Sequence, residues 1–407
     1  MKTKNIGLKK TILYIFKWLL MGILMGIVCG AMGTLFAKAV AFVTNARNEN
    51  GFLLYFLLPC GILSVFLYKL LRVDGISTDS VIGSVNGENQ LNKKIVPAIF
   101  GATLISQAFG ASVGKEGAAL QLGGGIAAAF SQFFKLNKED TKILTVCGMG
   151  AFFASLFGTP IGACIFAVEV AFIGKMVLSA LFPTLLSCII ASCISNFFGV
   201  EGEHFLLTVV PEFSFYSIVK VISIAVAAMA VGFIFVKLLH LCEKWSVKVM
   251  GNPYLRIALG AVVIIILTLA LGNNDYNGAG AHIIHKVMNG EQVNSFAFLL
   301  KILFTVVSVG AGFKGGEIVP TFFIGATLGS VMASVVGLDS VFASSVGMTA
   351  LFCFVTKCPL ASFVLASEMF GLKGAVFYLV AVIFSFLPIK NTGLYRSQKS
   401  NICKIDF

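Results

Sequence analysis

The stretch GASVGKEGAALQLGGG at residues 110–125 decides the fold, because it places one acid among glycines inside an apolar chain. Glu116 lies between Lys115 and Gly117, and nearly everything on either side of the stretch is apolar. An ionisable group at membrane depth is costly and marks an ion or proton pathway. Glycine lets the backbone leave helical geometry and point bare amide N–H groups at a ligand. A carboxylate beside such amides can compete with a small anion for the same donors.

The composition is that of a polytopic membrane protein. Of the 407 residues, 58% are hydrophobic and 12% are charged, and the mean hydropathy is +0.95, whereas soluble domains carry about 25% charged residues. The net charge of +12 gathers at both ends and in short loops, without the interleaved aromatics of a nucleic-acid-binding arm. By the positive-inside rule we expect a multi-pass protein of the cell membrane, with both termini in the cytoplasm and no nucleic-acid partner.

The apolar segments follow one another with short connectors, and their lengths do not fit straight spans. A straight span takes about 20 residues. Residues 93–110 are too few, whereas residues 142–173 are too many for one span and contain Gly and Pro breaks. Broken helices are tolerated at membrane depth only where protein or a cavity surrounds them. We therefore expect an all-α polytopic membrane protein with short, tilted and broken helices.

An internal repeat relates the two halves of the chain. GMGAFFASLFGTPIGACIFAVEV at 148–170 returns without a gap as GMTALFCFVTKCPLASFVLASEM at 347–369. The aligned positions lie at one constant spacing and pair identical residues, namely Gly148 with Gly347, Met149 with Met348, Pro160 with Pro359 and Glu169 with Glu368. GASVGKEG at 110–117 likewise resembles GAGFKGGE at 310–317.

Two halves with paired helix breaks predict a transporter whose substrate binds between them near the membrane midplane. We expect a single transport domain over residues 1–407, with a first repeat over about 50–200 and a second over about 214–390, and no soluble regulatory domain.

Three glycine-marked breaks are candidates for the binding site: residues 110–125, residues 310–325 and Gly75–Gly83. A helix that begins inside the membrane at each break supplies partial positive charge and free N–H groups without a full cation. Such donors bind an anion firmly enough to dehydrate it and loosely enough to release it. Glu116 is the candidate gate because it alone lies beside the donors. The alternative is that Glu116 pairs with Lys115 and fixes a turn.

These motifs resemble those of the CLC family of chloride channels and anion/proton antiporters. GKEG at 114–117 is similar to the family's G-R/K-E-G signature, GFKGGEIVP at 312–320 to its second-half glycine loop, and NTGLYRSQ at 391–398 to its C-terminal tyrosine segment. GTPIGACIFAVE at 158–169 resembles a fourth block, and all four occur in the family's order. The resemblance implies two inverted repeats, transport of chloride or another small inorganic anion with protons, and a homodimer in the lipid bilayer with one pathway in each subunit.

The resemblance also assigns roles to individual residues. It makes Glu116 the gating glutamate, which enters the anion site when ionised and leaves it when protonated. The hydroxyl of Tyr395 would contact the central anion, with an interfacial aromatic anchor as the alternative. The remaining expected anion-site positions lie at or beside the three breaks: Ile76, Lys115, Gly117, Glu317, Ile318 and Val319.

Departures from the chloride-type pattern bear on the substrate. Ile76 stands where chloride-type members carry a coordinating serine, with Ser77 and Ser80 close by, and Val170 stands at the position of the inner proton glutamate. GGEIVP is similar to the GGEVTP block of the fluoride/proton antiporter subclass, which lacks the same two groups, although Val319 replaces its threonine. The resemblance therefore favours a fluoride/proton antiporter, with a chloride channel or a chloride/proton antiporter as the alternative.

The other polar residues have plainer interpretations. Glu169 and Glu368 are expected to cap or pair near helix ends rather than to carry ions. His282 and His285 lie in a loop-like segment with no Cys or carboxylate at ligand spacing, so no metal or other cofactor is expected. Lys357 either adds positive potential to an anion vestibule or lies in a cytoplasmic loop. An intramembrane enzyme is a distant alternative, because the apolar spans carry no catalytic pair.

Overall fold

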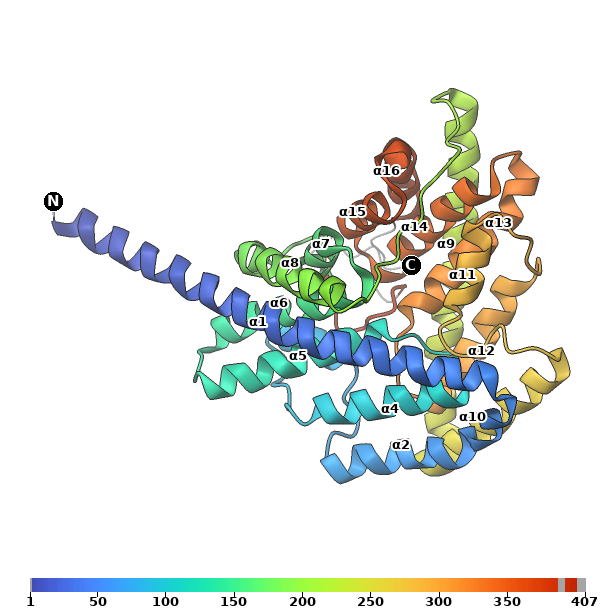
Figure 1. Ribbon diagram of the computed structural model, residues 1–407, viewed down its shortest axis with the longest axis horizontal. Helices are drawn as coiled ribbons and strands as arrows, with labels where there is room; N and C mark the ends of the chain where they lie inside the picture. Colours follow the sequence, from blue (N-terminus) through green and yellow to red (C-terminus); the bar gives the residue numbers. More distant parts are fainter. Residues whose placement is uncertain (1, 387–391, 401–407) are drawn as a thin grey trace.

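The computed structural model describes residues 2–386 and 392–400, so Asn391 at the start of the tyrosine segment lies outside it. The described chain is a bundle of helices that differ widely in length and tilt (Figure 1). The α-helices are α1 (Lys2–Glu49), α2 (Leu57–Leu71), α3 (Thr78–Val85), α4 (Ile95–Phe109), α5 (Glu116–Phe133), α6 (Lys138–Phe157), α7 (Pro160–Glu169), α8 (Leu181–Phe197), α9 (Phe215–Val249), α10 (Pro253–Leu271), α11 (Ala281–Met288), α12 (Ala297–Ala311), α13 (Ile318–Val336), α14 (Ser340–Thr356), α15 (Pro359–Phe370) and α16 (Ala375–Ser385).

Short elements complete the described chain. Three 3₁₀ turns precede α2, α8 and α16, at Gly51–Phe56, Leu178–Ala180 and Leu372–Gly374. Strands β1 (Phe172–Ile173) and β2 (Lys399–Ser400) form a parallel pair that ties the C-terminal segment to the end of the first repeat.

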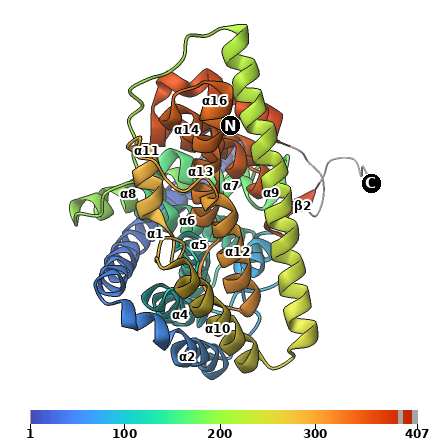
Figure 2. The ribbon, with the colours of Figure 1, turned by 90° about the vertical axis from the view of Figure 1, so that its right-hand side faces the viewer.

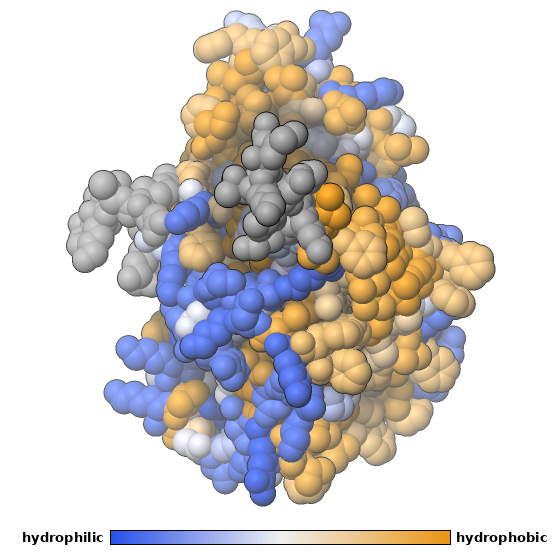
Figure 3. All heavy atoms as spheres, turned by 90° about the vertical axis from the view of Figure 1, so that its left-hand side faces the viewer, coloured by the Kyte–Doolittle hydropathy of each residue, from blue (hydrophilic) through white to orange (hydrophobic). Residues whose placement is uncertain are grey.

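Seven helical segments of the described chain are long and apolar enough to cross a bilayer. Peripheral helices such as α9 and α10 bury 33% and 28% of their apolar window inside the protein, whereas α6 buries 89% and α13 buries 72%. The core therefore lies around α5, α6, α13 and α14, and α9 runs along one side over most of the height of the molecule (Figure 2). On another face, hydrophobic side chains cover a broad area beside a band of hydrophilic ones (Figure 3).

The predicted helix breaks are confirmed. The apolar segment 142–173 contains α6 and α7, which are separated by Gly158 with a φ of 68°, and Pro160 is the first residue of α7. In the second repeat α14 and α15 are separated in the same way, and Pro359 is the first residue of α15. Proline suits this position because its missing N–H is one that a helix start leaves unpaired.

The repeat is visible in the helix crossings. α5 crosses α6 where Gly123 meets Gly148, and α13 crosses α14 where Gly325 meets Gly347. In each pair a Cβ atom on one glycine would overlap the carbonyl of the other. Small residues let helix backbones approach this closely within a membrane protein. The aligned glycines of the repeat therefore permit the same close helix crossing in both halves.

Glu169 and Glu368 cap each other's repeat. Glu169, at the end of α7, accepts hydrogen bonds at 3.2 and 2.7 Å from backbone N–H groups in the first turn of α15. Glu368, in α15, accepts bonds at 3.1 and 2.5 Å from N–H groups in the first turn of α7. The predicted capping role is thus confirmed, although Glu169 is buried rather than at a surface.

Candidate anion site

The glycine loops before α5 and α13 lie directly against each other. The N–H of Gly114 donates to the carbonyl of Gly316 at 2.6 Å, and the N–H of Gly316 donates to the carbonyl of Gly114 at 2.7 Å. A Cβ on Gly316 would overlap the backbone of Gly117, so this contact requires glycine. The two helices therefore begin side by side, as the resemblance between the two loops predicts.

A third helix begins at the same place. Thr78, the first residue of α3, donates its hydroxyl to the carbonyl of Gly117 at 3.4 Å and accepts a bond from the amide of Gln121 at 3.2 Å. The N-termini of α3, α5 and α13 thus meet around one point. Each N-terminus carries a partial positive charge and unpaired N–H groups, which together favour an anion.

A cavity of about 110 Å³, the central cavity, opens beside these helix starts. Three of the predicted anion-site residues, Ile76, Glu317 and Tyr395, line it. The hydroxyl of Tyr395 is buried and has no hydrogen-bond partner within the described residues, so it is available to an anion. The other polar side chains of the lining are Ser77, Thr78, Asp79, Gln121, His240, Glu243 and Lys314.

The backbone around Tyr395 is held on several sides. The N–H of Leu394 donates to the carbonyl of Val355 at 2.7 Å, and His240 approaches the carbonyl of Leu394 at 3.3 Å. The N–H of Ser397 donates to the carboxylate of Asp79 at 3.0 Å. These contacts fix the C-terminal segment against α3, α9 and α14, and so fix the tyrosine at the cavity.

Glu116 lies at the boundary of a second cavity. This cavity, the Glu203 cavity, has a volume of about 360 Å³, and its polar and apolar lining includes Arg47, Gln107, Lys115, Glu116, Glu203, His282, His285, Val319 and Phe322. Glu116 is 1% exposed, and neither of its carboxylate oxygens has a hydrogen-bond partner within the described chain. The alternative in which Glu116 pairs with Lys115 is therefore wrong.

The expected site residues thus divide between two neighbouring cavities. Ile76, Glu317 and Tyr395 line the central cavity, whereas Lys115 and Val319 line the Glu203 cavity. Gly117 lies at the loop contact and Ile318 is fully buried at the start of α13, between the two sets. Glu116 directly precedes Gly117 and lines the Glu203 cavity.

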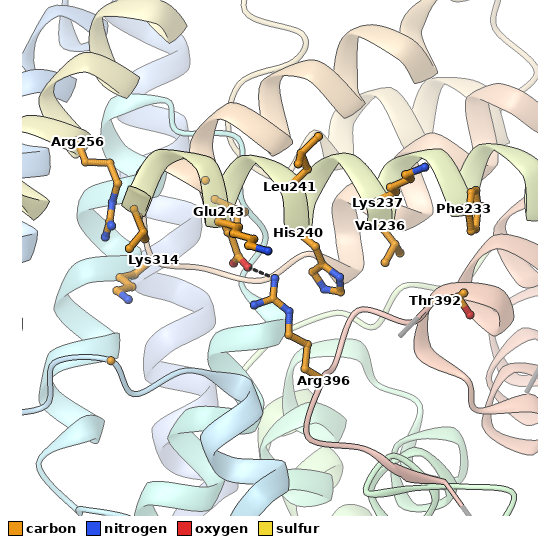
Figure 4. A pocket seen from close by; sticks show the side chains of 16 residues that line it. Phe233, Val236, Lys237, His240, Leu241, Glu243, Arg256, Lys314, Thr392 and Arg396 are labelled. Atoms are coloured by element: carbon orange, nitrogen blue, oxygen red, sulfur yellow. Dashed lines mark hydrogen bonds and ion pairs between the residues drawn. The ribbon is translucent and has the colours of Figure 1, made fainter. Parts of the chain in front are cut away.

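A third and larger cavity, the Arg396 cavity, lies on the side of the C-terminal segment. It has a volume of about 930 Å³, and Figure 4 shows Glu243 on α9 and Arg396 on the C-terminal segment pointing toward each other in its lining. Arg396 and Glu243 form an ion pair at 2.9 Å. The basic groups of the lining outnumber the acids, and they are Lys237, Lys244, Arg256, Lys314 and Arg396. Such a lining concentrates anions near the site.

Two interpretations of basic residues need correction. His282 and His285 lie on α11 and not in a loop, because the positive-φ Gly280 precedes the helix and the histidines follow inside it. His282 contacts Asp275 at 3.2 Å and His285 contacts Glu203 at 3.3 Å. Lys357 ends α14 in the left-handed conformation and is fully buried, with its Nζ 3.8 Å from the centre of the Phe354 ring, so it is not a loop lysine.

The sequence motifs did not reveal the acids that α3 and α9 bring to the central cavity. Asp79 and Glu243 lie far apart in the sequence and meet only through the fold. One signal was present, because His240 and Glu243 are ionisable residues within a 35-residue apolar helix. Such residues usually face a cavity or a partner.

Two halves built on paired broken helices, with helix starts gathered at a buried cavity between them, define a membrane transport protein of the inverted-repeat class. Residues 60–388 match the family described as voltage gated chloride channels. The chain therefore belongs to this family, the CLC proteins, whose members carry small anions across membranes.

Individual relatives agree with this assignment. The chain is 32% identical to the chloride/fluoride channel protein of Pseudomonas syringae pv. tomato, over 95% of this chain and 87% of that protein. It is 27% identical to the voltage-gated ClC-type chloride channel ClcB of Escherichia coli, over 66% of each. The crystal structure of a CLC-type fluoride/proton antiporter superposes with a TM-score of 0.92 at 29% identity, covering 95% of this chain and 98% of that one. A slow cyanobacterial Cl⁻/H⁺ antiporter, at 22% identity and a TM-score of 0.79, shares the fold.

Proposed function

We propose that this protein exchanges fluoride for protons across the cell membrane, with Glu116 as the protonatable gate. The observation that carries the proposal is the position of Glu116, which is buried beside paired backbone loops. Both of its carboxylate oxygens lack a hydrogen-bond partner among the described residues. When ionised, this carboxylate competes with the anion for the N–H groups of the helix starts. When protonated, it loses that attraction and withdraws, which opens the path.

Each group at the site has a role in this proposal. The backbone amides around Lys115–Gly117 and Glu317–Val319 line the anion path, and the hydroxyl of Tyr395 donates to the anion in the central cavity. Ile76 supplies an apolar wall in place of a hydroxyl. The anion is thus held by backbone and hydroxyl donors, and Lys314 in the same lining adds positive potential. Donors of this kind permit both dehydration and release.

Fluoride is favoured over chloride by two observations. The solved relative with a TM-score of 0.92 is described as a fluoride/proton antiporter, and the Pseudomonas relative as a chloride/fluoride channel. The resemblance aligns Ile76 with the coordinating serine of chloride-type members, and Ile76 lines the central cavity beside Ser77. A chloride channel or a chloride/proton antiporter is the alternative, supported by the name of the Escherichia coli relative.

The assembly follows from the exposed apolar surface of four neighbouring helices. We propose a homodimer in the lipid bilayer through α7, α8, α15 and α16, which lie together in Figure 1. Each contributes large hydrophobic side chains that are exposed in the single chain, among them Ile161, Phe182, Ile189, Leu360, Val376 and Ile383. The basic residues at the ends of the chain support a cytoplasmic position for both termini, and we propose that the whole chain acts as one transport domain.

Flux from proteoliposomes identifies the anion. Vesicles loaded with fluoride or with chloride are diluted into anion-free buffer while an electrode follows the anion and a dye follows external pH. We expect fluoride efflux with proton uptake, and much slower chloride efflux. Chloride efflux with proton uptake indicates a chloride antiporter, and anion efflux without any proton movement indicates a channel. Either result contradicts the proposal.

A further inference from the structure

Glu243 lies between the central cavity and the Arg396 cavity. It lies on α9, three residues after His240, and both side chains line the central cavity and the larger Arg396 cavity. In Figure 4 Glu243 and His240 point from α9 toward the C-terminal segment, where Arg396 meets the carboxylate at 2.9 Å. The side chain of Glu243 is 37% exposed, so water in the Arg396 cavity reaches it.

The central cavity shares His240, Glu243 and Lys314 with the Arg396 cavity, and its lining residue Gln121 lies on α5, the helix that begins at Glu116. A proton path from the Arg396 side to Glu116 can therefore run through this cavity, carried by acidic or imidazole side chains. Three carboxylates line the central cavity, Asp79, Glu243 and Glu317. Asp79 already accepts the backbone N–H of Ser397 at 3.0 Å. Of the three, Glu243 alone also lines the Arg396 cavity. His240 lines both cavities too, but its ring already contacts the carbonyl of Leu394 at 3.3 Å.

The position directly after α7, where the resemblance places the inner proton glutamate, offers no such group. Val170 is fully buried and apolar, and its carbonyl accepts a bond from Gln398 at 2.9 Å. The acid of α7, Glu169, is occupied by the first turn of α15. Both positions therefore lack a free carboxylate that reaches water.

The charges that face Glu243 come from every element packed around it. They are His240 and Lys244 on α9, Arg256 on α10, Lys314 before α13, Arg396 on the C-terminal segment, and the acids Asp79 and Glu317. An ion pair with both partners partly exposed is weak, so the contact with Arg396 does not lock the carboxylate. A carboxylate in this setting can take a proton and release it again.

We propose that Glu243 is the proton-relay residue on the Arg396 side of the site. A hydronium ion in the Arg396 cavity gives its proton to the Glu243 carboxylate and leaves as water. The carboxylic acid then turns to the central cavity, which has room for several water molecules, and passes the proton through them toward Glu116. The reverse sequence carries protons out. This inference rests on the proposed exchange of fluoride for protons.

Paired fluxes test the relay. In Glu243→Gln proteoliposomes we expect fluoride efflux to continue, while fluoride-driven proton uptake falls by about a hundredfold, the low end for loss of a positioned proton carrier. Arg396→Gln removes the partner but keeps the carboxylate, so proton uptake should persist. If Glu243 only held Arg396 in place, the two variants would behave alike, and that result overturns the relay.

A matched control is available on the same side of the protein. Glu88 pairs with Lys399 of the C-terminal segment at 3.4 Å, and its side chain is 46% exposed. Glu88→Gln should keep wild-type coupling. If Glu243→Gln does not fold, the double variant Glu243→Gln/Arg396→Gln removes both charges without leaving an unpaired guanidinium. Loss of its proton uptake supports the relay, and wild-type proton uptake contradicts it. Wild-type vesicles without any proton uptake contradict the proposed exchange, whereas a coupled wild type with a fully coupled Glu243→Gln contradicts the relay alone.

Discussion

Glu203 and His285 set the charge at the mouth of the cavity that contains Glu116. The hydrogen bond to Glu203 raises the pKa of His285, although burial acts against it. Burial opposes ionisation of Glu203, but the bond from His285 and the charge of Lys115 outweigh it and lower the pKa of Glu203. Below the raised pKa of His285 the pair is neutral as a whole. Above it the imidazolium loses its proton and Glu203 stays negative.

We therefore expect anion entry through the Glu203 cavity to slow as external pH rises through the pKa of His285, because an uncompensated carboxylate repels the anion. The initial rate of fluoride uptake measures this, in a Glu116→Gln background that removes the gate's own titration. His285→Gln should abolish the pH step and leave the slow rate at all pH values. His282→Gln, which breaks the contact with Asp275 on the same helix, is the control and should keep the step. An unchanged step in His285→Gln would show that another group sets it.

At the residue scale, the sequence motifs predicted those site residues that lie close together in one short segment. The glycines around Glu116 and Glu317 mark helix starts wherever they occur, so local sequence was enough. Asp79 and Glu243 were not predicted as site residues. They become so only because the fold brings α3 and α9 together at the cavities, which neither segment forms alone. The histidines of α11 were misplaced because the glycines before them resemble a loop.

At the scale of the element, reciprocal capping links the two repeats. Glu169 satisfies two N–H groups of α15, and Glu368 satisfies two of α7. Proline at the first position predicted where α7 and α15 begin, and the repeat alignment placed an acid near the end of each. The sequence left open which helix each acid caps, because that partner comes from the other half.

Removal of one cap should cost stability and leave coupling intact. Glu169→Ala removes the acceptor of the Leu360 and Ala361 N–H groups, of which that of Ala361 is buried. We therefore expect a loss of about 2 kcal/mol, read as a lower melting temperature in detergent. Glu368→Ala should lose less, because this end of the molecule is more open to water. The proton-to-fluoride ratio should stay at the wild-type value in both variants. Lost coupling without a change in melting temperature would make Glu169 a proton carrier and the capping account incomplete.

At the scale of the whole molecule, all three cavities lie within one chain, while the apolar surface of α7, α8, α15 and α16 lies open. Transport and assembly are therefore separable. The sequence predicted this architecture through the repeat, because equivalent breaks in two halves fix a site between them. The exposed surface was not predictable from hydropathy alone, since lipid-facing and partner-facing side chains are equally apolar.

Ile383→Trp should split the proposed dimer without loss of transport. Ile383 is 60% exposed on α16, and a larger ring there would clash with a second copy packed against these helices. We expect a monomeric mass by light scattering in detergent, with fluoride flux per chain unchanged. Ile266→Trp, at a position 59% exposed on α10, is the control and should stay dimeric. A wild-type protein that is monomeric, or an Ile383→Trp variant that keeps the dimer, would show that these helices face lipid.

The central claim is that protonation of Glu116 couples the anion to the proton, and a coupled flux measurement tests it most directly. Fluoride and proton movements are recorded together in vesicles with wild type, with Glu116→Gln, and with Glu212→Gln at an exposed loop position as the control. We predict coupled movement in the wild type and in the control. In Glu116→Gln we predict fluoride movement that no longer drives protons or depends on the titration of this residue. Unchanged flux, unchanged pH dependence and unchanged proton uptake in Glu116→Gln would contradict the account.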